Sequence, residues 1–534
     1  LSCFYLIYKA EPEFLPQIKA RKNQILFFQF IIISAGLFYK GSFISLGDDF
    51  KAWATSSKQL LYRHKFENNN DFTSLVGDYD FYPKGAAIFH YLILLPYGFS
   101  EGSALFAQFL ISFCLITPFF DKKNLYKSMI FVNAVLALAA SISPIFYSLY
   151  NEITLGLMLS SFFIIYLEAN NNENIISKLI PIIAAMPLFH HNGIIIALIG
   201  ISCFGVYHIK YIKNTNLYSL SKSHLKIITV FSSALTSYFL YLASTYFHLK
   251  ESFPILNIDF SLGITDLYNF GSFIKILFKS LIKEGAIAIY GLIFVSLKLI
   301  KKSEDEDLYK NYIALLKLLS YGLIAFVIYA FITRVLLFKD PIDMGGIRYF
   351  SSFILVFGAI SIYYISKLLD FQMLAQKFKI FFVAANIIAV SATILSFSRV
   401  PVSIPLEEEI YLSQLRAVRS AIDANKIVEF NFDNKERNLD CYIFGFNMAG
   451  KIDKSEMHKC FDHKTIHHNV YVGKYIKIPL IEEENCHLQY KPFLLNYEKI
   501  CKEEPMPNII EDIPALNGAD DKIIVPPEHL QQIK

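Results

Sequence analysis

Long apolar runs separated by short basic clusters constrain the fold of this sequence more than any other feature. A helix needs roughly 20 apolar residues to span a bilayer. Eleven runs are candidates, some of them shorter: 25–39, 100–120, 128–142, 151–168, 178–190, 193–209, 225–246, 284–300, 311–333, 349–367 and 380–398. Only 18% of the residues are charged, and a net charge of +4 is too small to indicate nucleic-acid binding. The sequence therefore predicts an α-helical polytopic membrane protein whose bundle covers residues 24–398.

Basic residues between these runs predict the orientation of the helices, because cytoplasmic loops are enriched in Lys and Arg. Lys19 and Lys22 precede the first run, so the loop after it, residues 40–84, is expected outside. The run 85–99 contains Pro and Gly and is predicted to be an interfacial helix. With that assignment, the later basic loops all fall inside. Residues 1–23 form an N-terminal segment, which we expect to follow a missing portion of chain; a short interfacial segment is the alternative.

The composition changes after Arg399, where charged and turn-forming residues become frequent. Residues 399–534 are predicted to form a small α/β domain outside the membrane, with an amphipathic helix at 412–425 and strands at 426–432 and 441–446. Four cysteines in an oxidising compartment indicate two disulfides, and three connectivities are open. They are Cys441, Cys460, Cys486 and Cys501. A zinc site with nearby histidines is the less favoured alternative, because no CxxC pair is present.

The external loop begins and ends with candidate functional residues. Asp48 and Asp49 follow the first run, and Trp53, the single tryptophan of the chain, comes shortly after. Adjacent carboxylates repel each other and are tolerated where they meet a cation, a metal or an acceptor hydroxyl. A helix cap is the simpler interpretation of this pair. Tyr82 and Lys84 flank a proline at the end of the loop, where an extended entry into the interfacial helix is expected.

Further candidates lie where other runs meet the predicted outer surface. Glu152 is at the start of the fourth run, where a carboxylate is either functional or favoured by the helix dipole. His190 and His191 occupy a predicted external turn, where they could bind phosphate or be structural. Arg348 and Tyr349 begin the tenth run, and the Arg either binds a phosphate or snorkels to the interface.

Together these motifs resemble the GT-C superfamily of membrane glycosyltransferases. The resemblance is closest to bacterial members that read W-D-E-F-x-x-W in the first external loop and D-Y-P-P-G before the interfacial helix. The counterparts here are Asp48, Asp49, Phe50 and Trp53, followed by Phe81, Tyr82, Pro83, Lys84 and Gly85. The sequence departs from the pattern at Gly47, Asp49 and Lys84, which replace Trp, Glu and the second Pro. The donor sugar is therefore not implied.

The resemblance implies transfer of a sugar from a polyprenyl-phosphate donor to a glycan, lipid or protein acceptor, with inversion, at the outer face of a bacterial inner membrane. Asp48 or Asp49 would be the general base. Arg348, with His190 or His191, would stabilise the lipid phosphate. The remaining substrate-binding candidates are Trp53, Tyr82, Lys84, Glu152 and Tyr349. No cofactor is required by the pattern, but a divalent cation (Mg²⁺ or Mn²⁺) held by Asp48 and Asp49 stays open.

Three alternative functions predict other sequence features. A polymerase or ligase of lipid-pyrophosphate-linked glycans would favour a large Arg-rich external loop late in the chain, and here the long loop comes first. A secondary transporter would favour inverted repeats and charges near the middle of the membrane. No repeat is visible, and the ionisable candidates cluster at one predicted surface. A receptor or scaffold would leave the acidic first loop unexplained.

Overall fold

The computed structural model divides the chain into two compact units, Leu1–Ser42 with Tyr82–Pro401 and Phe43–Phe81 with Val402–Lys534. Most of the predicted external loop therefore groups with the C-terminal segment. The residues that the structure describes are 22–40, 42, 44, 53–64, 83–96, 98–119, 125–142, 149, 151–168, 175–211, 217–249, 271–275, 277–279, 282, 284–302, 305–332, 346–368, 387, 390–391, 393–394, 428–432, 468–472, 486–491 and 496–501.

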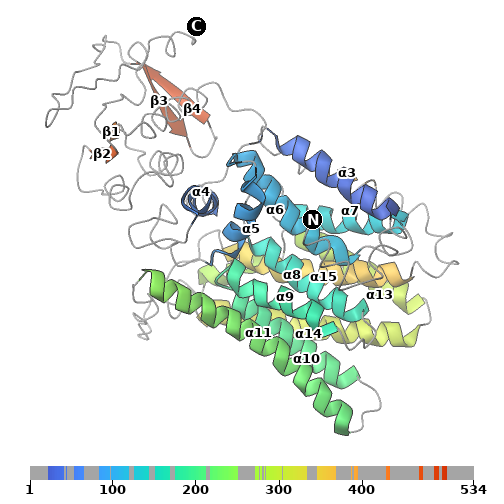
Figure 1. Ribbon diagram of the computed structural model, residues 1–534. Helices are drawn as coiled ribbons and strands as arrows, with labels where there is room; N and C mark the ends of the chain where they lie inside the picture. The colour runs from blue at the N-terminus through green and yellow to red at the C-terminus, as the bar shows by residue number, and fades with distance from the viewer. Residues whose placement is uncertain are drawn as a thin grey trace. The chain divides into compact units, whose positions relative to one another are not determined.

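The first unit is a bundle of helices (Figure 1). Its labelled helices are α3 (Lys22–Tyr39), α5 (Gly85–Leu94), α6 (Glu101–Ile116), α7 (Leu125–Ile142), α8 (Glu152–Glu168), α9 (Ile175–Phe189), α10 (Gly193–Tyr211), α11 (Leu217–Leu249), α13 (Glu284–Lys302), α14 (Glu306–Phe331) and α15 (Gly346–Leu368); a 3-10 turn, η3 (Thr117–Phe119), extends α6. Each of the first ten predicted runs overlaps one of these helices. The eleventh, 380–398, lies almost entirely outside the described residues.

Four helices in the described part of the chain are long and apolar enough to cross a membrane: Glu101–Phe119, His224–Ala243, Glu306–Phe331 and Phe350–Leu368. Shorter apolar helices accompany them, which identifies the chain as a helical integral membrane protein. The predicted interfacial segment contains α5, which has 10 residues. At 1.5 Å per residue it is about 15 Å long, roughly half the thickness of the hydrocarbon core.

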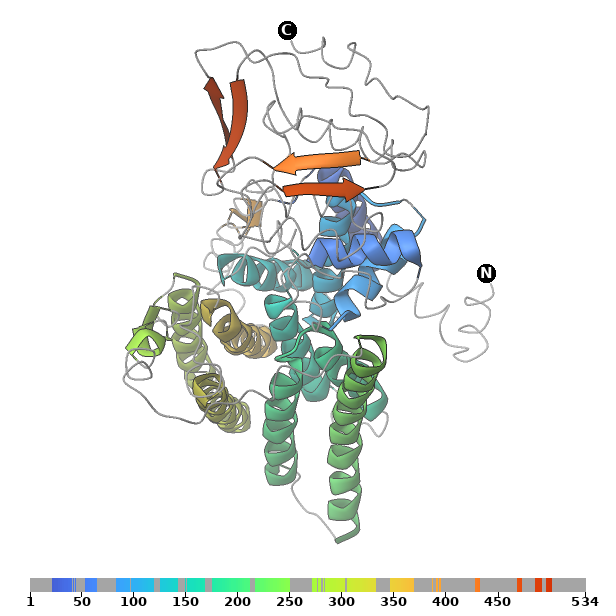
Figure 2. The ribbon, with the colours of Figure 1, turned by 90° about the vertical axis from the view of Figure 1, so that its left-hand side faces the viewer.

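Two helices form the centre of the bundle. All residues of α8 from Glu152 to Ile164 are buried, and α15 is buried from Phe350 to Ile365. α8 has no distinct polar face, as expected of a helix in such a position. By contrast, α11 and α14 expose large apolar side chains such as Leu240 and Ile324. Figure 2 shows the same bundle turned by 90°, with α10 and α11 side by side.

The two central helices run parallel in a constant register. At one end, the Ser352 hydroxyl donates a hydrogen bond to the Glu152 carbonyl oxygen. At the other end, Lys367 Nζ lies 2.6 Å from Glu168 Oε1. Between them, an added Cβ on Gly156 would lie 2.7 Å from the Ser352 carbonyl oxygen. The missing side chain therefore allows the two backbones to approach closely, and the helices begin at the same end of the bundle.

The second unit contains α4 (Ala54–Arg63) and four strands. β1 (Val428–Phe432) pairs with β2 (His468–Val472), and β3 (Cys486–Lys491) pairs with β4 (Asn496–Cys501), both antiparallel. β1 falls within the strand predicted at 426–432. The helix predicted at 412–425 and the strand predicted at 441–446 lie outside the described residues.

Candidate functional site

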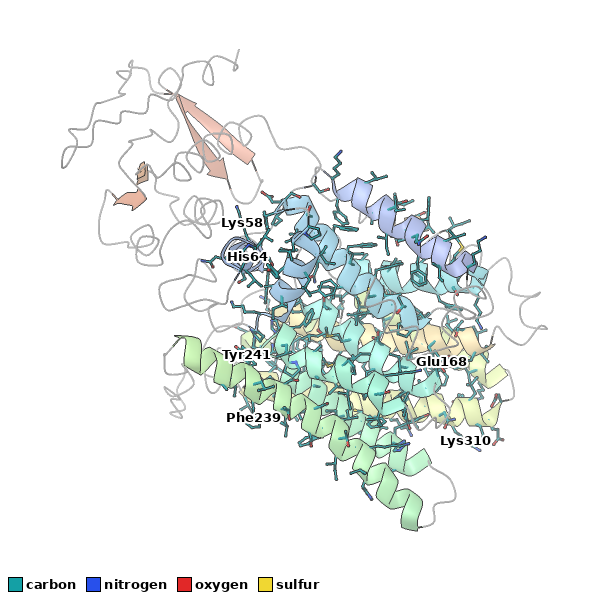
Figure 3. The ribbon with its side chains drawn as sticks, in the orientation of Figure 1. Lys58, His64, Glu168, Phe239, Tyr241 and Lys310 are labelled. Carbon is teal, nitrogen blue, oxygen red and sulfur yellow. The ribbon has the colours of Figure 1, made fainter. Side chains whose placement is uncertain are left out.

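The parallel register of α8 and α15 brings two sequence-predicted site residues to one end of the bundle. Glu152 is the first residue of α8 and is 5% exposed. Arg348 and Tyr349 lie in the first turn of α15, one turn before Ser352, which contacts the Glu152 backbone. The structure describes the backbone of Arg348 and Tyr349 and not their side chains. Figure 3 labels Glu168 and Lys310 at the opposite end of the bundle.

The turn between α9 and α10 lies at this same end. The backbone N–H of Gly193 donates to the His190 carbonyl over 2.8 Å, and that of Asn192 donates to His190 Nδ1 over 3.1 Å. Because Nδ1 accepts, the neutral ring carries its proton on Nε2. The ring centroids of His190 and His191 are 4.1 Å apart. His190 is buried, so one part of its role is to hold the turn.

Aromatic and polar contacts of α14 connect this turn to the start of α15. The Tyr329 hydroxyl donates to Asn192 Oδ1 over 3.4 Å. One turn earlier in α14, the Phe326 ring packs against the rings of Phe350 and Phe353, with centroids 5.9 and 5.0 Å apart. The histidine turn and the first turn of α15 are therefore held by neighbouring residues of a single helix.

Lys84 joins the same end through the start of α5. A Cβ added to Gly85 would lie 2.5 Å from the Leu188 carbonyl oxygen, so only glycine permits this approach of α5 to the end of α9. Leu188 precedes His190 by two residues. Lys84 is half-buried, and it immediately precedes Gly85, so its backbone lies near the histidine turn.

A buried polar chain that the sequence analysis missed connects α5, α6 and α8. His90 Nε2 lies 2.9 Å from Gln108 Oε1, and Gln108 Nε2 donates to Thr154 Oγ1 over 3.0 Å and to Asn151 Oδ1 over 3.4 Å. Burial lowers the pKa of His90 to about 4, so its imidazole is neutral at physiological pH. A lone Gln within the apolar run 100–120 was the available signal, because polar side chains inside membrane helices usually have a partner or a function.

The remaining predicted site residues belong to the second unit or lie outside the described residues. Trp53 belongs to the second unit, where it is buried at the start of α4 and its carbonyl accepts a 2.9 Å hydrogen bond from Ser57. Asp48, Asp49 and Tyr82 lie outside the described residues. The catalytic carboxylates, and the alternative that they cap a helix, therefore stay predictions.

Two of the four cysteines predicted to form disulfides are among the described residues of the second unit. Cys486 and Cys501 are register partners at the open end of the β3–β4 hairpin. Cys441 and Cys460 lie outside the described residues. Within the part of the chain that the structure describes, no group of three His, Cys, Asp or Glu residues could hold a metal ion; Asp48 and Asp49 are not in that part.

The arrangement gathers one carboxylate, one lysine, two imidazoles and the arginine-bearing turn of α15 at one end of a membrane bundle. A guanidinium and an ammonium bind phosphate oxygens through charge-assisted hydrogen bonds. A carboxylate and neutral amides instead suit hydroxyl groups, which both donate and accept. The chemistry of this end therefore suits a ligand with an anionic part and a polyhydroxylated part.

Comparison with solved structures gives a distant match. The chain is similar to ArnT. The crystal structure of ArnT from Cupriavidus metallidurans in the apo state has 12% sequence identity and a TM-score of 0.38, and the match covers 81% of this chain and 75% of that one. The structure of the same protein bound to undecaprenyl phosphate has the same identity and TM-score, with 80% and 75% covered. No protein-family model and no curated protein matches the sequence. The functional argument therefore rests on the residues of this chain.

Proposed function

We propose that this chain is a membrane glycosyltransferase that moves a sugar from a polyprenyl-phosphate donor to a glycan, lipid or protein acceptor at the external membrane face. One observation carries the proposal: the parallel register of α8 and α15 brings Glu152 and the first turn of α15, with Arg348, to the same end. Lys84 and the histidine turn, which come from distant parts of the sequence, lie at that end too.

The proposed chemistry divides the charged residues into two roles. Arg348 and Lys84 neutralise the phosphate of the lipid donor, and His190 or His191 donates a further hydrogen bond as the phosphate departs. Asp48 or Asp49 removes the proton from the acceptor hydroxyl, which attacks the anomeric carbon from the face opposite the phosphate. The C–O bond to the phosphate breaks as the new glycosidic bond forms. Inversion at the anomeric carbon follows from a single displacement.

The location of the reaction follows from the basic loops of the sequence, which place the starts of α8 and α15 outside. Residues 399–534 are then an extracytoplasmic domain, which we propose to be of the α/β type and to bind the acceptor. A bacterial inner membrane is the compartment that fits this orientation. The lipid carrier proposed here is of the same class as the undecaprenyl phosphate bound in the second ArnT structure.

The test is an assay of sugar transfer from total lipid-linked sugars with purified full-length variants. We expect Arg348→Ala to lower the transfer rate by about 100-fold, because removing a preorganised donor to a developing anion costs 10²–10³ in rate. Asp48→Asn and Asp49→Asn test the base, and we expect one of them to abolish transfer. Lys310→Ala is the matched control, since Lys310 is an exposed cation at the opposite end of the bundle.

Two outcomes would contradict the proposal. Normal transfer by both aspartate variants would remove the catalytic assignment, provided that each variant reaches the membrane in normal amounts. A cysteine-accessibility map that places residues 48 and 348 on opposite sides of the membrane would do the same without an activity assay.

A further inference from the structure

The buried polar chain between α5, α6 and α8 fixes the orientation of each of its amide groups. Gln108 Nε2 is within donating distance of two oxygens, Thr154 Oγ1 and Asn151 Oδ1. Its Oε1 must therefore accept from His90 Nε2, which lies 2.9 Å away. His90 is neutral, so this contact also fixes its tautomer. Gln108 has no freedom to exchange its oxygen and nitrogen without losing these hydrogen bonds.

The same logic fixes the amide of Asn151, which immediately precedes α8. Its Oδ1 faces the Gln108 amide, so its Nδ2 faces away from Gln108. Asn151 is fully buried, and Nδ2 has no hydrogen-bond partner within the part of the chain that the structure describes. A buried donor without an acceptor is costly, because it has given up its hydrogen bonds to water. An acceptor from a bound ligand would remove that cost.

The surroundings of this donor favour a neutral ligand rather than a phosphate. Asn151 is adjacent to Glu152, whose carboxylate accepts hydrogen bonds and repels anions. An amide donor and a carboxylate acceptor at the start of one helix together complement hydroxyl groups, each of which can donate and accept. The Nδ2 atom is closed to solvent here, so a sugar gains this contact only when neighbouring side chains move apart on binding.

We propose that Asn151 and Glu152 form the subsite for hydroxyl groups of the donor sugar, and that Gln108 is the positioning residue that points the Asn151 amide into it. The proposal rests on the function proposed above and adds a site for the sugar, separate from the cations that bind the phosphate. Asn151 was not among the residues predicted from the sequence to bind substrate, and Gln108 acts only through it.

The test compares the binding of two classes of lipid to the full-length protein in detergent by native mass spectrometry. The first is undecaprenyl phosphate alone. The second is a panel of synthetic lipids in which a hexose or a pentose is linked to undecaprenyl phosphate. We expect wild type to bind its preferred glycosylated lipid more tightly than undecaprenyl phosphate. Asn151→Ala should weaken binding of that glycosylated lipid by about three- to tenfold, the effect of one lost hydrogen bond. Its affinity for undecaprenyl phosphate should be unchanged, and Asn151→Ser, which keeps a donor, should recover part of the loss.

Gln108→Met tests the positioning role, because Met keeps the length of the side chain and removes both hydrogen-bonding groups. It should weaken binding of the glycosylated lipid less than Asn151→Ala does, and the double variant should bind no more weakly than Asn151→Ala alone. Ser112→Ala is the matched control, since Ser112 is a buried polar residue one turn further along α6 with no partner for its hydroxyl among the described residues. It should bind both lipids like wild type.

The outcomes separate this inference from the proposed function. If wild type binds undecaprenyl phosphate and a glycosylated lipid, and Asn151→Ala binds each of them as tightly as wild type does, the sugar subsite is wrong and the proposed function stands. Equal weakening for both lipids would show a structural role for Asn151 and would also overturn the subsite. If wild type binds neither class of lipid, the proposed function fails, and the subsite fails with it.

Discussion

The close contact of α8 with α15 at Gly156 predicts a large effect of one added methyl group. A Cβ at this position would lie 2.7 Å from the Ser352 carbonyl oxygen and 3.0 Å from its Cα, whereas ordinary van der Waals contact begins at 3.4 Å. Both atoms belong to the backbone, so no side chain can rotate away. The two helices must therefore separate by roughly 0.7 Å at this point, and overpacking of this kind costs about 1–3 kcal/mol.

Gly291→Ala is the matched control for Gly156→Ala. Gly291 lies in α13 with no heavy atom within 4 Å of an added Cβ. Both substitutions replace a helical glycine by alanine and gain a similar helix propensity, about 1 kcal/mol in soluble hosts. The difference between the two variants therefore isolates the packing cost. We expect Gly156→Ala to be less stable than Gly291→Ala by about 1–3 kcal/mol, measured by denaturant unfolding in the same detergent. Equal stability of the two variants would refute the close parallel packing of α8 and α15.

Two further predictions concern His90 and the cysteines of the second unit. Because burial lowers the pKa of His90 from 6.5 to about 4, the unfolded state takes up its proton first as the pH falls. Stability should therefore be lost between pH 6.5 and pH 4, and wild type should lose about 2 kcal/mol more than His90→Asn between pH 7 and pH 5, in parallel thermal unfolding; equal losses would contradict the burial of His90. Antiparallel partners have Cα atoms about 4.5–5.5 Å apart, within the range of a disulfide. Non-reducing peptide mapping should accordingly find Cys486 linked to Cys501, and a link of either residue to Cys441 or Cys460 would contradict this prediction.

The positions of the membrane helices could be predicted because their signal is local. The run 151–168 corresponds to α8 (Glu152–Glu168), and the run 284–300 corresponds to α13 (Glu284–Lys302). In α11 the predicted span 225–246 agrees with the membrane-length stretch His224–Ala243, but the helix itself is longer and covers Leu217–Leu249. Its first turns carry Ser and Lys, which are compatible with a helix but not with the hydrocarbon core, so a search for apolar residues omits them.

The candidate site was only partly predictable, because contacts between helices leave a weaker signal in a single sequence than the apolar runs that form the helices. Glu152 and Arg348 could be placed at one surface from the basic loops alone. The role of Gln108 could not, because its three partners, His90, Asn151 and Thr154, lie in two other helices or next to them. Gly156 likewise looks like an ordinary glycine in an apolar helix until the backbone of α15 is seen against it.

The first turn of α8 connects the two halves of the proposed site, and its two neighbours can be perturbed independently. On one side, Gln108 of α6 hydrogen-bonds Asn151 and Thr154 and so controls an amide that faces the sugar. On the other side, Ser352 of α15 contacts the Glu152 backbone and so controls how far Arg348 lies from that sugar. Gln108→Met should therefore change which lipid-linked sugar is preferred, with little change in the affinity for the bare lipid phosphate. Gly156→Ala displaces the phosphate-binding turn relative to the sugar site and should lower the rate of transfer for every donor. If the sugar and the phosphate were bound by one subsite, both substitutions would change donor preference and transfer rate together. Two subsites that meet at the start of α8 allow each substitution to change one of these properties.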